Sequence, residues 1–395
     1  MNQQVKSIEP VNLPILSFFT GGGFLDMGFE QAGFSIKWTN EIHLGFADFY
    51  KHGMTAWRRH INPQAQEAVI SSAMPLSELG GPDSIMNTVF PTGKPKLFGM
   101  IGGPPCQDFS IAGLRAGFEG SRGSLTHEYC RHVLEMRPAF FVMENVTGLM
   151  QKNHRATFYK LCESLGGKYL LDHKKVNALD YGVRQSRERL FLIGIRRDLV
   201  RKDLSEDQQQ LVPMENWAGW TAEQHETHHK HRKTCQWAKV EEKDAMPKAP
   251  ACETIRALCV DQCLVPLGQE ELTPNAWDHF VLNSEKAKQT PEGMVSSRCF
   301  KRLHRYRFSP TACYGNNEVH LHPWLPRRLS VREVLRIQGV DDSYVLPPGP
   351  PLTTKFKMIG NGVPVPMAEG IARTMRRVLE QYCGLRLNTE AKGNN

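Results

Sequence analysis

Short apolar runs alternate with amphipathic stretches through the first half of the chain. The apolar runs have strand length and recur at 14–19, 35–39, 96–101, 139–143, 168–176 and 189–196. Apolar residues at helical spacing occupy several of the intervals, at 24–32, 124–136 and 154–165. Strands that alternate with helices favour an α/β fold, with a mostly parallel sheet and helices on both of its faces.

This rhythm stops after about residue 197. Residues 201–326 are rich in Gln, His, Trp and isolated Pro, and their apolar positions follow no clear period. Such a pattern is typical of an irregular domain with little regular sheet. Ordered elements return at Ser330-Val-Arg-Glu333, which has the form of a capping box that opens a helix.

Two prolines near the end of the chain, Pro364 and Pro366, precede a final amphipathic stretch that predicts a helix to about Tyr382. We therefore expect a first domain, a smaller second domain that includes the capped helix, and a C-terminal helical segment, with bounds at 1–200, 201–353 and 354–395.

One cysteine follows a predicted strand inside a turn of two glycines and two prolines. Cys106 comes directly after Ile101-Gly-Gly-Pro-Pro, and the next predicted strand along the sheet delivers Glu144 and Asn145 at its own end. A lone cysteine is more often a small buried residue than a nucleophile. A carboxyl group at a neighbouring strand end favours a reactive thiol, although Glu144 taken alone is equally a helix-capping acid.

A glycine-rich turn, Gly21-Gly-Gly23, follows the first predicted strand and precedes a helix. Glycines and helix-terminal N–H groups in this arrangement are typical of nucleotide-type cofactor sites. The next strand ends at Glu41, where a carboxylate accepts hydrogen bonds from a ribose or caps the helix near His43. Because the turn lacks the lysine of a phosphate loop, the pattern suits an adenosine ligand without a triphosphate.

These segments resemble the motifs of the cytosine carbon-5 methyltransferase family and occur in that family's order. The match spans roughly 14–197 and 327–382, through Phe19-Thr-Gly-Gly-Gly, Gly103-Pro-Pro-Cys-Gln-Asp-Phe-Ser, Glu144-Asn-Val, Gln185-Ser-Arg-Glu-Arg-Leu, Arg328-Leu-Ser-Val-Arg-Glu-Val-Leu-Arg-Ile-Gln-Gly and Gly360-Asn-Gly-Val-Pro-Val-Pro. One position departs from the family pattern: Phe24 stands where the family usually has a second adjacent glycine, which leaves the path of the cofactor loop open.

The resemblance implies a Rossmann-like methyltransferase domain that binds S-adenosylmethionine, together with a target-recognition domain. A thiolate at Cys106 would add to carbon 6 of cytosine while Glu144 protonates N3, because carbon 5 by itself is too weak a nucleophile. The resemblance further implies roles for both arginines of the paired motif, Arg187 and Arg189, with Arg189 on the cytosine O2. It assigns the cofactor to Phe19, Gly21, Gly23, Glu41 and Asn361, and substrate contacts to Gln107, Ser110 and Asn145.

The formal net charge is +8, with a pI near 8.9, a modest excess that suits a polyanionic partner. Within 201–326 acidic and basic residues are nearly equal in number, but Arg298–Arg307 is locally basic and contains Phe300 and Tyr306. Two interpretations stay open for this stretch. Either it contacts DNA through Arg302, Arg305 and Arg307, or it is an exposed basic strand.

Other features bound the remaining interpretations. The ten cysteines show no paired framework, the N-terminus lacks a signal-peptide core, and no apolar run is long enough to span a bilayer. These features predict a cytoplasmic, nucleoid-associated monomer. His225, His228, His229, His231 and Cys235 form a cluster without metal-site spacing, as do Cys259 and Cys263, so we expect no metal.

The sequence thus predicts a DNA cytosine carbon-5 methyltransferase that acts on a base flipped out of double-stranded DNA, with a cognate restriction endonuclease as a partner. A tRNA methyltransferase of the same fold is the alternative enzyme; the residues Phe109-Ser110 and the long 201–326 segment favour DNA. A silent DNA-binding module fails to explain the thiol, acid and arginines, and a nicotinamide dehydrogenase fails to explain Pro-Pro-Cys-Gln.

Overall fold

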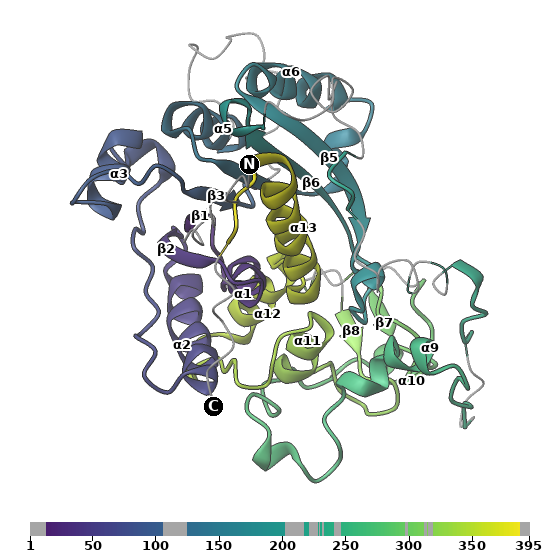
Figure 1. Cartoon of the computed structure of the whole chain (residues 1–395). Helices are drawn as coiled ribbons and strands as arrows, with labels where there is room; N and C mark the ends of the chain where they lie inside the picture. The colour runs from purple at the N-terminus through teal and green to yellow at the C-terminus, as the bar shows by residue number, and fades with distance from the viewer. Residues whose placement is uncertain are drawn as a thin grey trace, which may run out of the picture.

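A six-stranded sheet lies at the centre of the larger part of the molecule (Figure 1). The computed structural model describes residues 13–105, 125–201, 217–220, 228, 230, 233–240, 246–296, 299–311, 314 and 319–387. The strand order is β2-β1-β3-β4-β6-β5. The strands are β1 (Pro14–Phe18), β2 (Ser35–Asn40), β3 (Gly99–Gly102), β4 (Phe140–Asn145), β5 (Tyr169–Asn177) and β6 (Glu188–Arg196).

The sheet is mostly parallel, as the alternation of apolar runs predicts. Neighbours from β2 through β4 pair in parallel, whereas β6 runs antiparallel to both β4 and β5. All six strands lie within a few residues of their predicted positions. The alternation does not indicate the orientation of β6, and this orientation determines which residues lie beside the end of β4.

Helices cover both faces of the sheet (Figure 1). Successive side chains of a strand point to opposite faces. Ile15 of β1 accordingly packs with α1 (Phe24–Gln31) and α13 (Val365–Cys383), whereas Leu16 packs on the other face. That other face carries α3 (Pro82–Val89), α5 (Leu125–Met136) and α6 (Arg155–Gly166). The final helix thus returns to the sheet and lies against the first one.

A third apolar cluster joins the sheet domain to the second part of the molecule. It combines side chains of α2 (Leu44–Ile61), α11 (Val331–Ile337) and α12 (Leu352–Asn361). Helix α11 begins at the predicted capping box: the Ser330 hydroxyl accepts from the Glu333 backbone N–H, and the Glu333 carboxylate accepts from the Ser330 N–H.

The second part has little regular structure in its described residues. A two-stranded parallel sheet pairs β7 (Phe300–Arg302) with β8 (Val319–Leu321), beside the short helices α9 (Glu253–Ala257) and α10 (Glu285–Gln289). Its own apolar cluster is small and consists of Leu282, Ala287, Val319 and Leu321, with Phe300 packed against them. We call the described residues from 246 to 329 the recognition region.

Residues 217–220 belong with the sheet, although they fall inside the segment predicted to form the second domain. The Ala218 N–H and the Trp220 indole both donate to the buried Asp172 carboxylate of β5, at 2.8 and 3.0 Å. Arg377 of α13 donates to the Ala218 carbonyl. β5 is an edge strand, and its outer backbone groups have no partner strand among the described residues. Residues 217–220 cover this edge.

Candidate active site

Four strand termini meet at one edge of the sheet. β1, β3 and β4 run in parallel, so their carboxyl ends lie at the same edge. β6 runs the other way, and the pairs Glu144–Phe191 and Asn145–Leu190 place its first residues beside the end of β4. Antiparallel pairing therefore brings Arg189, at the start of one strand, to Glu144, at the end of another.

These termini surround a cavity of about 220 Å³. Its walls combine residues predicted for the cofactor with residues predicted for catalysis. They are Phe19, Thr20, Gly21, Gly22, Phe24, Leu25, Glu41, Ile42, Phe46, Gly103, Pro105, Leu125, Glu144, Met358, Asn361, Gly362 and Val363. One compartment thus contacts the cofactor loop, the acid and the turn that leads to Cys106.

The glycine turn lines part of the cavity. Gly21 and Gly23 have positive φ values of 59° and 87°, which glycine adopts without steric cost, and Gly23 caps α1. Phe19 has a φ of 54°, an unusual value for a bulky residue. Gly23 itself does not line the cavity. As the N-cap residue it turns the chain into α1, and its contact with the cofactor stays a prediction.

Glu41 ties this turn to the end of β2. Its two carboxylate oxygens accept from the Gly21 and His43 N–H groups, each at 2.8 Å. A carboxylate oxygen has a second lone pair, so Glu41 retains acceptor capacity toward the cavity. A ribose, whose two hydroxyls can donate, fits this acceptor, and so does the adenosine ligand that the sequence predicts. Asn361, at the end of α12, lines the same cavity and is exposed.

Glu144 is a buried acid held by one arginine. Its side chain is only 8% exposed, and Arg189 Nε lies 2.8 Å from its Oε1. Burial raises the pKa of Glu144 above its ordinary value, although Arg189 and Arg187 both act to lower it. A Cβ atom at Gly103 would lie 2.9 Å from Glu144 Oε2, so the acid borders the turn that precedes Cys106.

Arg187, predicted to act at the catalytic site together with Arg189, contacts the backbone at the end of α12. It is fully buried, and its Nη2 donates to the Gly360 carbonyl at 2.7 Å. Its guanidinium therefore joins the start of β6 to the end of α12, beside Asn361. Toward Glu144 it acts only through its charge.

Asn145 contacts the turn before Cys106, and its contact with the substrate stays a prediction. Its Nδ2 donates to the Pro104 carbonyl at 3.0 Å, and its Oδ1 accepts from the Val146 N–H. The amide therefore holds the turn before Cys106 in place. Cys106, Gln107 and Ser110 themselves lie outside the described residues; the description reaches Pro105, which lines the cavity.

Arg302 corrects the DNA interpretation of the basic stretch. It is 5% exposed, and its guanidinium donates to the backbone carbonyls of Thr290, Ala287 and His322. A side chain enclosed in this way does not reach a phosphate. It supplies hydrogen bonds to carbonyls that no regular sheet satisfies.

Arg305 and Arg307 differ from Arg302 and from each other. Arg305 forms a two-point ion pair with Glu292 and lies over the Trp324 ring, 4.3 Å from its centroid. Arg307 lies over the Phe308 ring, and no carboxylate among the described residues pairs with it. Of the three arginines, Arg307 thus fits the predicted phosphate contact best.

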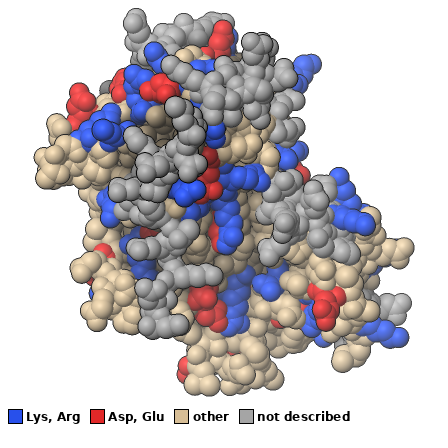
Figure 2. Space-filling model, in the orientation of Figure 1, with Lys and Arg blue, Asp and Glu red and all other residues tan. Residues whose placement is uncertain are grey.

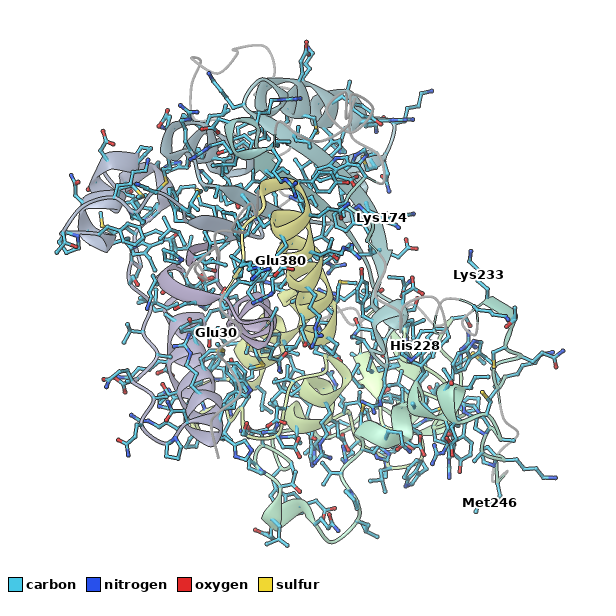
Figure 3. All side chains as sticks on the ribbon, viewed as in Figure 1. Glu30, Lys174, His228, Lys233, Met246 and Glu380 are labelled. Carbon is cyan, nitrogen blue, oxygen red and sulfur yellow. The ribbon has the colours of Figure 1, made fainter. Side chains whose placement is uncertain are left out.

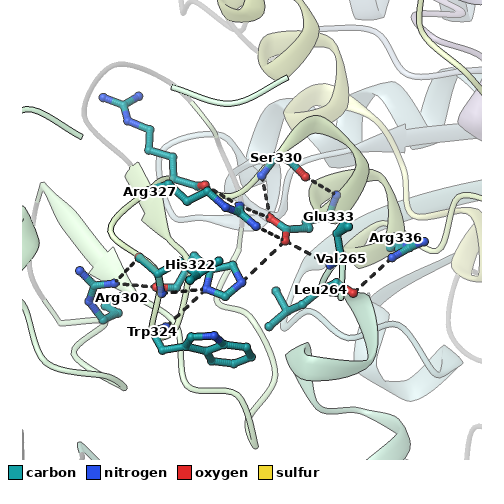
Figure 4. A network of polar contacts seen from close by, with 11 residues as sticks. Leu264, Val265, Arg302, His322, Trp324, Arg327, Ser330, Glu333 and Arg336 are labelled. Atoms are coloured by element: carbon teal, nitrogen blue, oxygen red, sulfur yellow. Dashed lines mark hydrogen bonds and ion pairs between the residues drawn. The ribbon is translucent and has the colours of Figure 1, made fainter. Parts of the chain in front are cut away.

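A buried ionic cluster lies between the recognition region and α11 (Figure 4). Glu333 is fully buried and accepts from both Arg327 Nη atoms, at 2.7 and 2.8 Å, and from the Val265 N–H. Burial acts to raise the pKa of Glu333, but the hydrogen bonds and charge of Arg327, with smaller effects of His322 and the Ser330 N–H, together outweigh burial and lower the pKa. The sequence indicated Glu333 as a helix cap but not as the centre of this cluster.

The sequence reasoning also missed a buried acid beneath the cofactor turn. Asp26 of α1 is fully buried and accepts from the Ser17 hydroxyl at 2.6 Å. Burial raises its pKa to about 7. The available signal was an acidic residue within the apolar run Phe24-Leu-Asp-Met-Gly-Phe.

The surface gives limited further information. The face shown in Figure 2 carries Lys and Arg interspersed with Asp and Glu, in keeping with a modest net charge. Lys174 projects from the edge strand β5, and His228 of the predicted histidine cluster lies near Gly182 (Figure 3).

Within the described ranges, no group of three or more His, Cys, Asp or Glu side chains could hold a metal ion. None of the described helices is both long enough and apolar enough to cross a bilayer.

An α/β sheet with a cofactor turn and a buried acid on one cavity defines the class of the protein as a methyltransferase-type enzyme. A family model for C-5 cytosine-specific DNA methylases matches residues 13–377. A Type II methyltransferase of Neisseria meningitidis serogroup C is 37% identical to this chain, over 93% of this chain and 84% of that protein. The chain therefore belongs to the C-5 cytosine-specific DNA methylase family and is a DNA cytosine-5 methyltransferase.

Other relatives and solved structures agree. A Type II methyltransferase of Methanothermobacter thermautotrophicus is 28% identical over 94% of this chain and 99% of that protein. The crystal structure of a putative DNA modification methyltransferase from an E. coli prophage has a TM-score of 0.56 at 24% identity and covers 94% of this chain and 100% of its own. The S. pombe Dnmt2 methyltransferase has a TM-score of 0.55 at 14% identity, over 93% of this chain and 99% of its own, and shares the fold.

Proposed function

We propose that the enzyme methylates carbon 5 of a cytosine that is flipped out of double-stranded DNA, through a covalent adduct with Cys106. The observation that carries the proposal is the shared cavity, in which Glu144 and Pro105 face the same space as Phe19, Glu41 and Asn361. S-adenosylmethionine, when bound there, supplies an electrophilic methyl group. A base must leave the duplex to enter such a compartment.

Cys106 and Glu144 then have defined tasks. The Cys106 thiolate forms a bond to carbon 6 of cytosine, and the electrons of the ring double bonds shift as N3 takes a proton from Glu144. This addition makes carbon 5 nucleophilic. Burial raises the pKa of Glu144, which favours the protonated form that this donation needs. Carbon 5 would then form a bond to the methyl group as the bond between that methyl and the cofactor sulfur breaks. Loss of the carbon-5 proton to a base, return of the N3 proton and elimination of the thiolate would restore the aromatic ring and free the enzyme.

Arg189 is placed to exchange partners during this reaction. In the structure its Nε contacts Glu144 Oε1, and its Nη1 donates to the Glu188 carbonyl. An entering base would present its O2 to this guanidinium and its N3 to Glu144. The positive field at this edge also favours the Cys106 thiolate over the thiol.

The relatives favour DNA as the substrate and a restriction–modification setting, because their printed names are Type II methyltransferases. We extend this setting to the chain, with a cognate endonuclease as its partner and a monomer acting on DNA in the cytoplasm. The Dnmt2 likeness supports the fold only, so the tRNA alternative has no residue-level observation in its favour.

A trapping experiment tests this proposal. Labelled S-adenosylmethionine should transfer its methyl group to DNA and not to tRNA, and bisulfite sequencing of DNA from expressing cells identifies the target site. Duplexes with 5-fluorocytosine at that site should form a complex that survives denaturation, because fluorine is not eliminated as the proton is. Cys106→Ala should abolish the complex, while the exposed Cys299→Ala serves as control. An adduct that persists in Cys106→Ala contradicts the covalent role.

A further inference from the structure

A tyrosine from the segment after α11 reaches the cofactor turn. Tyr344 is fully buried, and its hydroxyl donates to the Gly22 carbonyl at 2.7 Å, with the Phe49 carbonyl of α2 at 3.3 Å. Gly22 lies in the wall of the cavity. Burial raises the pKa of Tyr344 above its ordinary value, so the hydroxyl is a protonated donor at neutral pH.

The ring of Tyr344 fixes a second part of the same wall. Phe24 packs against it edge to face, with ring centroids 5.5 Å apart, and Phe24 lines the cavity. On its other side the ring fills the space over Gly53 of α2, where an added Cβ would come within 2.1 Å of it. The residue that departs from the family pattern thus has a specific neighbour: Phe24 extends the cavity wall onto Tyr344.

Tyr344 is itself anchored on the side of the recognition region. Its backbone carbonyl accepts from Arg332 of α11 at 2.9 Å, and the same guanidinium donates to the Pro274 carbonyl. The Leu346 N–H donates to the Asn275 side chain. One short segment therefore contacts α11, the recognition region and the cofactor turn.

We propose that Tyr344 is a positioning residue for S-adenosylmethionine, which holds the Gly22 carbonyl and the Phe24 ring in the arrangement that the cofactor binds. Cofactor affinity then depends on a segment far along the chain from the glycine turn. This inference rests on the proposed function insofar as the cofactor is S-adenosylmethionine. The competing interpretation is that Tyr344 only contributes to the stability of the core.

Tyr344→Phe removes the hydroxyl and retains the ring. A buried hydrogen bond of this kind changes an equilibrium by roughly two- to tenfold. We expect the Kd for S-adenosylmethionine, measured by calorimetry on the full chain, to rise by that factor. The KM for S-adenosylmethionine should rise in parallel, while kcat stays within about twofold of wild type, because Tyr344 touches no reacting group.

Tyr169→Phe is the matched control. Tyr169 is equally buried, and its hydroxyl also lies between two backbone carbonyls, those of Val133 and Pro138, but neither of these lies in the cavity wall as Gly22 does. Both variants should lose similar thermal stability, and only Tyr344→Phe should lose cofactor affinity. Equal Kd values for Tyr344→Phe and wild type would overturn the inference and leave the proposed function intact. Equal weakening by Tyr169→Phe would also overturn it, whereas a wild-type chain that binds no S-adenosylmethionine would contradict the proposed function itself.

Discussion

The sheet domain and the recognition region satisfy their backbone groups in different ways. In the six-stranded sheet, each strand pairs with its neighbours, so backbone carbonyls and N–H groups bond to each other between the strands. The recognition region has only the short β7–β8 pair and a small apolar cluster. There a buried arginine supplies donors instead: Arg302 donates to the carbonyls of Ala287 and Thr290 at the end of α10 and to that of His322 in a second segment.

This difference teaches how to interpret basic residues in an irregular region. A guanidinium carries five donors and no acceptor, so it can serve several carbonyls at once where no strand lies alongside. The same residue type is the commonest partner of DNA phosphates. Burial decides between the two uses: Arg302 is enclosed, whereas Arg307 is half-buried, with its guanidinium against an aromatic ring.

The largest expected effect concerns the sheet domain, where a single buried acid performs chemistry. Glu144→Gln should keep the fold and S-adenosylmethionine binding but lose about 10²- to 10⁴-fold in single-turnover rate, because an amide cannot donate an acidic proton to N3. Glu188→Gln, at the first residue of β6 and exposed beside Lys175, is the control and should be silent. A Glu144→Gln rate within about twofold of wild type would exclude the proton-donor role.

The second prediction separates structural arginines from surface arginines in the recognition region. Arg302→Met leaves several buried carbonyls without donors, and each such group costs about 1–3 kcal/mol. We expect a loss of about 3–5 kcal/mol in the free energy of unfolding, measured by urea titration. Arg307→Met should change stability by no more than about 0.5 kcal/mol.

DNA binding should reverse this order. Arg307→Met should lower the slope of log affinity against log salt by about 0.9 if Arg307 contacts one phosphate, with little change in stability. An unchanged salt slope for Arg307→Met would contradict a contact between Arg307 and a DNA phosphate. A stable, well-folded Arg302→Met would contradict the comparison between the two regions.

The smallest prediction contrasts two buried acids. Asp26 has a folded pKa of about 7, above its value of 3.8 in the unfolded chain, because burial raises the pKa by more than the Ser17 hydrogen bond and the Arg58 charge lower it. The folded state therefore holds the proton more tightly, and stability falls as pH rises from about 4 to 7. Asp26→Asn should remove this dependence. The free energy of unfolding of the variant, relative to that of wild type, should therefore rise by on the order of 2–3 kcal/mol between pH 5 and pH 8.

Glu333 supplies the opposite case. Its folded pKa is lowered, so its contribution to stability is complete above the unfolded value of 4.5 and is lost only as pH falls below it. Glu333→Gln should therefore lower stability by a constant amount between pH 5 and pH 8. A wild-type curve that runs parallel to that of Asp26→Asn over this range would contradict the assignment of Asp26.

The sequence by itself determined the elements and most of the chemistry at their ends. The strands and sheet helices, the glycine turn, the capping box at Ser330 and the acid after β4 all follow from short-range patterns, because periodicity and local hydrogen bonding act within a few residues. The resemblance to a family then ordered these pieces into one enzyme, and the family match supports that reading.

Only the tertiary structure decided which polar groups meet. Antiparallel pairing of β6 brings Arg189 to Glu144, while Arg187 turns to the Gly360 carbonyl. Tyr344 contacts Gly22 although 322 positions separate them. A sequence records that a donor exists but not its partner, because phosphate, carboxylate and backbone carbonyl all accept from the same guanidinium, and the choice depends on which segments pack together.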